Sequence, residues 1–231
     1  RILHDDMRDT VQASSILTLV GRGCSRLSEI AARLNKPATS LTRPIGRLME
    51  LGLIRREYPF GASPKSSKKT LYSIDDPFIA MWYRYVEPNR SRLQTGAVDA
   101  VARKIEEDYP NHVGRIWEKL ARDSVARIPI YEEDWQPPRR WWGRGINGEQ
   151  MELDIVTESI DGEHLLVGEC KLTVSVRDLP RIRRRLEQRA DNLPFAERYR
   201  KIYTVIFAGD QGAQPESPDL LAPNAVFNSL V

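Results

Sequence analysis

The segment that most constrains the fold runs from His164 to Leu172 and reads His-Leu-Leu-Val-Gly-Glu-Cys-Lys-Leu. It begins as a continuous apolar run of strand length, which is typical of a strand inside an α/β protein. It ends in Glu169 and Lys171, which lie two residues apart and therefore share one face of the strand, while Cys170 points the opposite way into packing. Charges at the end of a buried strand are costly unless they are paired, solvated or bound to metal. The segment therefore predicts a buried strand that carries two charged residues to one site.

A second strand is expected just before this one, at residues 151–158. Period-two alternation would place Glu152 and Asp154 on one face of it and Leu153 and Ile155 on the other. An Asp-Gly pair between the two segments predicts a hairpin turn. Pairing through that turn would bring Asp154 toward the charged end of the following strand.

Asp154, Glu169 and Lys171 would then form one site. Two carboxylates with an open position suit a hard divalent cation, Mg²⁺ or Mn²⁺, which lowers the pKa of a bound water and stabilises charge on a phosphate. Lys171 would orient the attacking water or help to deprotonate it, and Glu118 lies in a helix expected at residues 113–125. A lone Glu-x-Lys is more often a structural ion pair, so that alternative stays open.

The N-terminal third predicts a winged helix-turn-helix, in which the third helix enters the DNA major groove. The expected elements are helices at residues 14–20, 27–34 (capped by Ser28) and 39–51, followed by strands at 53–58 and 69–74. Between Gly21 and Tyr72 there are eleven Lys and Arg residues and three Glu. This excess of positive charge is the electrostatic footprint of a module that contacts phosphates.

The candidate DNA-contacting residues share a place on the third helix or on the hairpin, and they are Arg43, Arg47, Arg55, Arg56, Lys65, Lys68 and Lys69. The alternative is a solvated basic surface on a winged helix that packs against a partner protein. A chain of 231 residues favours more than one compact unit. The expected division is a tail at 1–9, the winged helix at 10–75, a helical aromatic connector at 76–110 and a C-terminal domain at 111–231.

The connector is rich in aromatic residues, which at helical spacing more often form a buried core than a platform for bases. A helix is expected at residues 97–108, and Pro110 would end it. Beyond the charged strand we expect an arginine-rich helix at 176–192, whose cations either touch phosphates or form a solvated face. A central strand at 201–209 and an edge strand at 225–231 would complete the sheet.

The sequence excludes several classes of protein. No apolar run approaches the roughly 20 residues that span a bilayer. The N-terminal residues lack the apolar stretch of a secretory signal, and without an initiator Met the chain is expected to be a piece of a longer protein. Cys24 and Cys170 are too far apart in sequence for a disulfide framework or a zinc motif, which favours the cytoplasm.

The arrangement of Asp154 with Glu169, Cys170 and Lys171 resembles the PD-(D/E)xK nuclease superfamily. More specifically, the chain is similar to the C-terminal region of prokaryotic AAA-type P-loop ATPases, in which a winged helix precedes a DUF234-like domain with a nuclease-like core. The matching stretches are Arg26-Leu-Ser-Glu-Ile-Ala, Leu71-Tyr-Ser-Ile-Asp-Asp-Pro-Phe, Trp82-Tyr-Arg-Tyr-Val, Trp141-Trp-Gly, Glu152-Leu-Asp-Ile-Val and Gly168-Glu-Cys-Lys.

The resemblance implies a mixed α/β fold, with a winged helix-turn-helix followed by a restriction-endonuclease-like sheet flanked by helices. It implies that Asp154 and Glu169 are metal ligands, Lys171 the catalytic lysine and Glu118 an accessory acid. Leu153 replaces the proline usual before the aspartate. No G-x-x-x-x-G-K-[ST] motif occurs, so the ATPase domain would lie outside this chain and no nucleotide site is expected within it.

The function expected from these features is DNA binding coupled to metal-dependent phosphodiester hydrolysis. Two alternatives stay open: a non-catalytic DNA-binding or regulatory module, and a protein-interaction adaptor that docks through the aromatic connector. The sequence leaves the oligomeric state open.

Overall fold

The computed structural model describes residues 10–63, 69–210 and 217–231. Its contacts divide the chain into two compact units, one of Arg1–Tyr58 and Ser63–Tyr109, the other of Pro59–Ala62 and Pro110–Val231. Helices and two sheets, one of them mixed, make the fold mixed α/β, as the sequence predicts. Among the described helices, none has the length and apolar character to cross a membrane.

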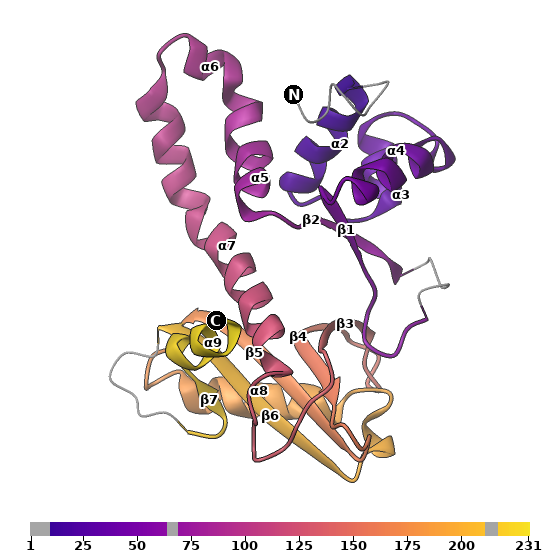
Figure 1. Ribbon diagram of the computed structural model, residues 1–231, viewed down its shortest axis with the longest axis vertical. Coiled ribbons are helices and arrows are strands. Elements are labelled where there is room, and N and C mark those ends of the chain that lie inside the picture. Colours follow the sequence, from indigo (N-terminus) through magenta and orange to yellow (C-terminus); the bar gives the residue numbers. More distant parts are fainter. Residues whose placement is uncertain (1–9, 64–68, 211–216) are drawn as a thin grey trace. The chain divides into compact units, whose positions relative to one another are not determined.

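The first unit begins with three helices and a hairpin (Figure 1), which confirms the predicted order. The elements are α2 (Thr10–Gly21), α3 (Leu27–Arg33), α4 (Ala38–Glu50), β1 (Ile54–Glu57) and its antiparallel partner β2 (Leu71–Ile74). Ile16, Ile30, Leu41 and Leu48 are fully buried at their centre, so one apolar stripe from each helix builds the core. The predicted cap is wrong: Arg26 precedes α3, and Ser28 lies inside its first turn.

The aromatic segment that follows packs within the first unit. It comprises α5 (Pro77–Met81), the π-helical turn η2 (Trp82–Val86), the 3₁₀ turn η3 (Glu87–Asn89) and α6 (Arg90–Gln94). Tyr85 is buried and donates to Asp108 Oδ2 at 2.7 Å. Arg84 donates to both oxygens of the same carboxylate at 2.5 and 3.0 Å. Phe78, by contrast, is 62% exposed, so only part of this aromatic set forms a core.

One long helix, α7 (Val98–Val125), continues through Pro110. The predicted stop at Pro110 and the two separate helices are therefore wrong. A proline in a helix interior removes one hydrogen bond and destabilises the helix by about 3 kcal/mol. Buried side chains on both sides of it, Val101 and Trp117, supply the packing that offsets this loss.

The second unit is a five-stranded mixed sheet in the order β3-β4-β5-β6-β7. Its strands are β3 (Arg139–Arg144), β4 (Gln150–Glu158), β5 (His164–Thr173), β6 (Lys201–Asp210) and β7 (Leu220–Leu221). The first three are antiparallel and the last three are parallel. One core cluster joins the sheet to α8 (Leu179–Asp191), and another joins the opposite face to α7 and α9 (Pro223–Leu230) (Figure 1).

The expected edge strand at 225–231 is wrong, because this segment is the helix α9. Pro223 occupies its first position, where a proline favours helix initiation. Val226 is fully buried against the sheet, so the apolar residues cover a face instead of extending an edge. The edge is the two-residue strand β7.

A β-bulge interrupts β4 at Asp154 and Ile155, where β3 offers the single opposing residue Arg140. Leu153 consequently packs in the cluster beneath α8, whereas Ile155 packs in the cluster beneath α7. The prediction that Leu153 and Ile155 share one face is therefore wrong. Strict alternation fails here because the bulge adds one residue to the strand.

Candidate functional site

The strands β4 and β5 part beside Asp154. Their register pairs run from Glu158–Leu165 to Ile155–Gly168. Beyond the last pair, the backbone N–H of Cys170 donates to Asp154 Oδ2 at 2.8 Å. Where the backbone pairing of β4 and β5 ends, the Asp154 carboxylate therefore accepts a hydrogen bond from the backbone of β5.

Glu169 is held by two cations. Lys171 Nζ lies 2.6 Å from its Oε1, and Arg189 Nη1 from α8 lies 3.0 Å from its Oε2. The Glu169 side chain is 15% exposed, whereas that of Lys171 is 42% exposed. The structure therefore places the predicted Glu-x-Lys pair together, and Cys170 is buried on the opposite face as expected. Arg189 is the residue that sequence reasoning did not assign to the site.

The pKa of the Asp154 carboxyl lies above its ordinary value. Burial, together with the nearby carboxylates of Glu118 and Glu169, raises its pKa from 3.8 to about 6. The pKa of Glu118 is also raised by burial, against the opposing charges of Arg140 and Arg122. Lys171 also acts on Asp154, so the other three residues singled out by the sequence all lie within electrostatic reach of Asp154. Perturbed carboxylates gathered in this way are typical of functional sites.

Arg122 supports the bulge that carries Asp154. It lies in α7, is only 9% exposed, and donates from Nη1 to the backbone oxygen of Asp154 at 3.1 Å. A buried arginine is expensive unless its charge is compensated, so its place here is tied to the acids beside it. Sequence reasoning missed Arg122, although it follows Glu118 by four residues, the spacing that places two side chains on the same helix face.

The donor set decides which metals fit. In the described part of the chain, no three or more His, Cys, Asp or Glu side chains are grouped so that they could hold a metal ion. Mg²⁺ commonly binds through one or two carboxylates and keeps several waters, so Asp154 and Glu169 are the residues that would hold this cation or Mn²⁺.

The predicted DNA-contacting residues of α4 lie on its exposed side. Arg43 is exposed, and Arg47 is paired with Glu50 at 2.8 Å across two partly exposed side chains. A Cβ added at Gly46 would meet nothing within 4 Å, so this part of the helix is uncovered. The surface is therefore open to a partner.

The hairpin cations are more constrained. Arg55 contacts Glu57 at 3.0 Å and Asp75 at 3.2 Å, so its charge is already compensated. Arg56 donates to Thr70 Oγ1 at 3.3 Å and stacks on an aromatic ring. Lys69 is exposed. The predicted contacts Lys65 and Lys68 lie outside the described residues.

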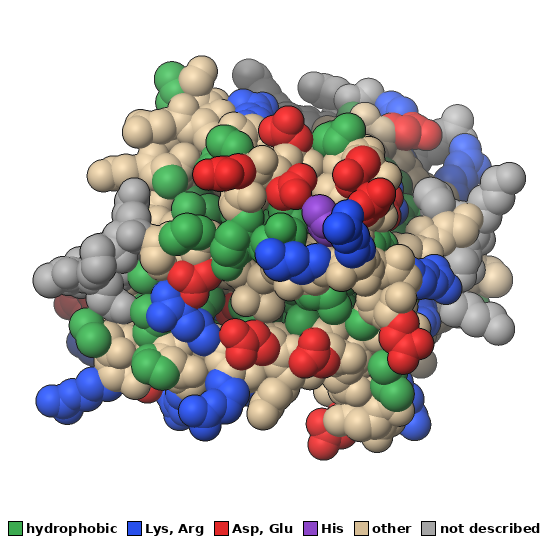
Figure 2. Space-filling view, turned by 90° about the horizontal axis from the view of Figure 1, so that it is seen from below, with side chains coloured by type: hydrophobic (Ala, Val, Ile, Leu, Met, Phe, Trp, Pro, Cys, Tyr) green, Lys and Arg blue, Asp and Glu red, His purple; other side chains and the backbone are tan. Residues whose placement is uncertain are grey.

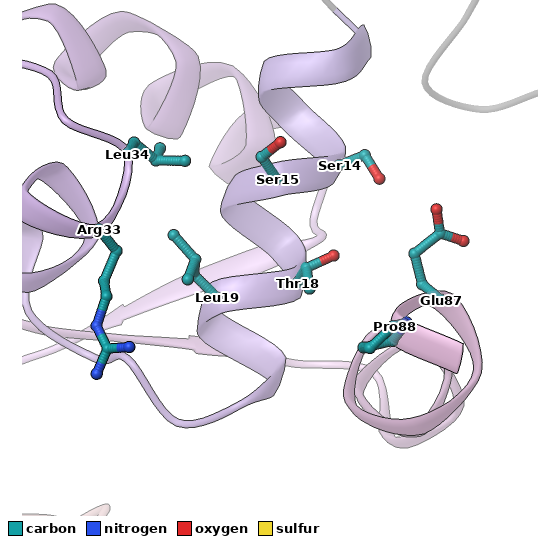
Figure 3. A pocket seen from close by; sticks show the side chains of 8 residues that line it. All are labelled: Ser14, Ser15, Thr18, Leu19, Arg33, Leu34, Glu87 and Pro88. Atoms are coloured by element: carbon teal, nitrogen blue, oxygen red, sulfur yellow. The ribbon is translucent and has the colours of Figure 1, made fainter. Parts of the chain in front are cut away.

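A hollow of about 380 Å³ lies beside α2 in the first unit (Figure 3). It is lined by Ser14, Ser15, Thr18, Leu19, Arg33, Leu34, Glu87 and Pro88. Figure 3 shows the charged groups of Arg33 and Glu87 on opposite sides of α2, so the two charges do not converge on one point. This arrangement lacks the convergent polar groups of a ligand pocket.

Comparisons with known proteins give a partial match. Residues 82–182 match the DUF234 family, described as archaeal and bacterial proteins of unknown function. An uncharacterized protein of Methanocaldococcus jannaschii is 31% identical over 209 residues, which cover 89% of this chain and 46% of that protein. The chain thus spans about half the length of this relative. No solved structure matches the chain.

Proposed function

We propose that this chain binds DNA and hydrolyses phosphodiester bonds at a divalent-metal site formed by Asp154 and Glu169. The observation that carries the proposal is the gathering of Asp154, Glu169 and Lys171 where β4 and β5 part, with the Asp154 pKa raised to about 6. A carboxylate cluster that repels itself is stabilised when a cation joins it. A bound cation would offset the repulsion between Asp154 and the carboxylates near it.

Mg²⁺ or Mn²⁺ at these carboxylates would supply Lewis acidity toward water and phosphate. Hydrolysis forms a bond between a water oxygen and phosphorus, breaks one P–O ester bond and leaves a proton on the departing oxygen. Lys171 Nζ, with 42% of its side chain exposed, can hydrogen-bond to that water while it stays beside Glu169. Arg189 supplies a second positive charge for the phosphate, because its guanidinium already lies at the Glu169 carboxylate.

Glu118 and Arg122 act on the site from α7. Burial raises the pKa of Glu118 and so favours its protonated form relative to that of an exposed glutamate. Arg122 positions the Asp154 backbone through its 3.1 Å hydrogen bond. These two residues would set the charge and geometry of the site without binding the phosphate themselves.

The first unit would bring DNA to the protein through α4. The exposed Arg43, the partly exposed Arg47 and the open space at Gly46 support a recognition surface. We further propose that the chain is the C-terminal part of an AAA-type ATPase, since the archaeal relative extends well beyond the matched region.

The ion pairs of Glu169 favour a second candidate function. Both of its oxygens are already engaged by cations at 2.6 and 3.0 Å, as in a structural salt-bridge network. A chain of this second kind would bind DNA in a regulatory role and need no metal. Metal-dependent cleavage separates the two candidates.

The test is cleavage of single-stranded, duplex and branched DNA with Mg²⁺ or Mn²⁺. Asp154→Ala and Lys171→Ala are the site variants, and Asp134→Ala, at an exposed position of the same unit, is the matched control. We expect cleavage by the wild type and the control, and at least a 100-fold loss in both site variants, as for removal of groups that act in the chemical step. Equal background cleavage in all four proteins would exclude the nuclease function.

A further inference from the structure

A row of arginines leads along α8 to the candidate site. Arg181, Arg185 and Arg189 follow one another at four-residue intervals, and Arg177 continues the same spacing just before the helix. Residues four apart form a ridge on a helix surface, with about 6 Å of rise between neighbours. Leu186 and other apolar residues of α8 pack toward the sheet. We call Arg177, Arg181, Arg185 and Arg189 the arginine ridge.

The outer members of the ridge are available to a partner. Arg177 and Arg185 are exposed, and neither forms a hydrogen bond or ion pair with any residue that the structure describes. Arg181 is paired with Asp178 at 2.9 Å, where the two side chains are 80% and 50% exposed. A pair as exposed as this one contributes little stability and exchanges readily for another anion.

Another arginine of the same helix shows what internal compensation looks like. Arg183 is bonded to the Asp219 carboxylate and to Ser217, so its charge is used within the fold. Within the ridge, Arg181 has only its exposed pair with Asp178, and the last member, Arg189, reaches Glu169 at 3.0 Å. Like charges four residues apart on a helix destabilise it. The ridge therefore favours an anion that joins its members.

The geometry points to a path for one DNA strand, whose phosphates would lie along the arginine ridge and enter the site at Arg189. Guanidinium groups bind phosphate oxygens in a bidentate manner, which suits a repeated phosphate backbone. A single ridge contacts a single line of phosphates, so the occupant is one strand. This inference rests on the proposed function for the chemistry at the end of the path.

Figure 2 shows one face of the molecule, on which acidic and basic side chains are interspersed among hydrophobic ones without a broad area of one sign. A mixed surface attracts a polyanion less than a line of like charges does. The ridge repeats one charge in one direction.

The experiment measures binding without cleavage. A fluorescein-labelled single-stranded DNA oligonucleotide is titrated with the full chain in EDTA, and the dissociation constant is measured over a series of salt concentrations. The test variant is Arg181→Ala/Arg185→Ala, which leaves Arg189 and the carboxylates intact. Because both side chains are on the surface, thermal unfolding followed by circular dichroism should match the wild type.

The matched control is Arg198→Ala/Arg200→Ala, which removes the same charge from two exposed positions. Arg200 directly precedes Lys201, the register partner of His164, and Glu169 lies about 16 Å further along β5. The exposed Arg200–Glu163 pair that it breaks, with 79% and 56% exposed side chains, contributes little. The control therefore separates local contacts from the effect of net charge.

We expect the ridge variant to bind single-stranded DNA on the order of 10-fold more weakly at 0.15 M salt. Its slope of log K against log salt should fall by about 1.4, since each lost single-strand phosphate contact removes about 0.7. The control should keep the wild-type slope. Equal slopes in the ridge variant and the wild type would overturn the proposal that DNA binds along the ridge. Absence of DNA binding by the wild type and both variants would overturn it as well.

Cleavage assays in Mg²⁺ on the same proteins distinguish this inference from the proposed function. If the ridge variant binds DNA normally and the wild type cleaves it, the DNA path along the ridge is refuted and the nuclease function is not. Weakened binding by the ridge variant, with no cleavage by any protein, supports the ridge and refutes the nuclease function.

Discussion

Replacing Asp154 by Asn should make the metal-free protein more stable at neutral pH. The pKa of the Asp154 carboxyl is raised from 3.8 to about 6 by burial and by Glu118 and Glu169, so its charged form is disfavoured in the folded state. Asn removes the charge and keeps an oxygen that accepts the 2.8 Å hydrogen bond from the Cys170 N–H. The substitution therefore isolates the electrostatic term.

The magnitude follows from the pKa shift of about two units. One unit corresponds to 1.36 kcal/mol, which gives about 3 kcal/mol as an upper value and about 1–2 kcal/mol after solvent screening of a partly exposed group. A carboxyl whose folded pKa exceeds its unfolded pKa binds more protons when folded, so stability falls as pH rises from about 4 to about 6. The variant lacks that fall, and its advantage should be small at pH 4 and complete above pH 7.

The assay is urea unfolding in EDTA at several pH values between 4 and 8. Asp134→Asn, at an exposed aspartate of the same unit, controls for the loss of one negative charge. We expect the difference in unfolding free energy between Asp154→Asn and the wild type to grow with pH, and that of the control to stay constant. A variant that is less stable than the wild type at pH 8 would refute the reasoning.

Three further predictions concern single contacts in the structure. Gly168→Ala should destabilise the fold by about 1–3 kcal/mol in urea unfolding, because its Cβ would lie 2.9 Å from Ile155 Cβ; wild-type stability would contradict that close approach. Gly46→Ala should raise stability by about 0.5–1 kcal/mol, since it adds a helix-favouring residue in open space, and a loss in the same assay would mean that the site is covered. Arg122→Met should weaken Mn²⁺ affinity by roughly 10-fold in calorimetric titration, because Arg122 positions the Asp154 backbone and such supporting residues commonly change affinity by 10–100-fold; unchanged affinity would remove it from the site.

Local periodicity predicts much of this fold. The helices α2, α3 and α4 and the strands β4 to β6 were recoverable because each buries an apolar stripe or run that the sequence displays directly. Glu169 and Lys171 followed from the period of two along β5, and their 2.6 Å contact agrees with it. Local patterns are sufficient where one element determines the spacing.

Long-range packing determines what the sequence did not show. Pro110 reads as a helix stop, but α7 continues because buried residues on both sides hold it. The bulge at Asp154 arises from the register between β3 and β4, and no local sequence pattern predicts it. Arg189 reaches Glu169 from α8, twenty residues away, so only the tertiary structure identifies it as a member of the site.

Titration of the full chain with Mn²⁺ tests the metal site most directly. By isothermal calorimetry at pH 7.5, we expect the wild type to bind Mn²⁺ and Asp154→Asn and Glu169→Gln to bind at least 10-fold more weakly, as for loss of a carboxylate ligand. Affinity of the wild type should fall as pH drops below about 6, because the cation must displace the Asp154 proton. Equal binding by the wild type and both variants, or none by any of them, would contradict the site.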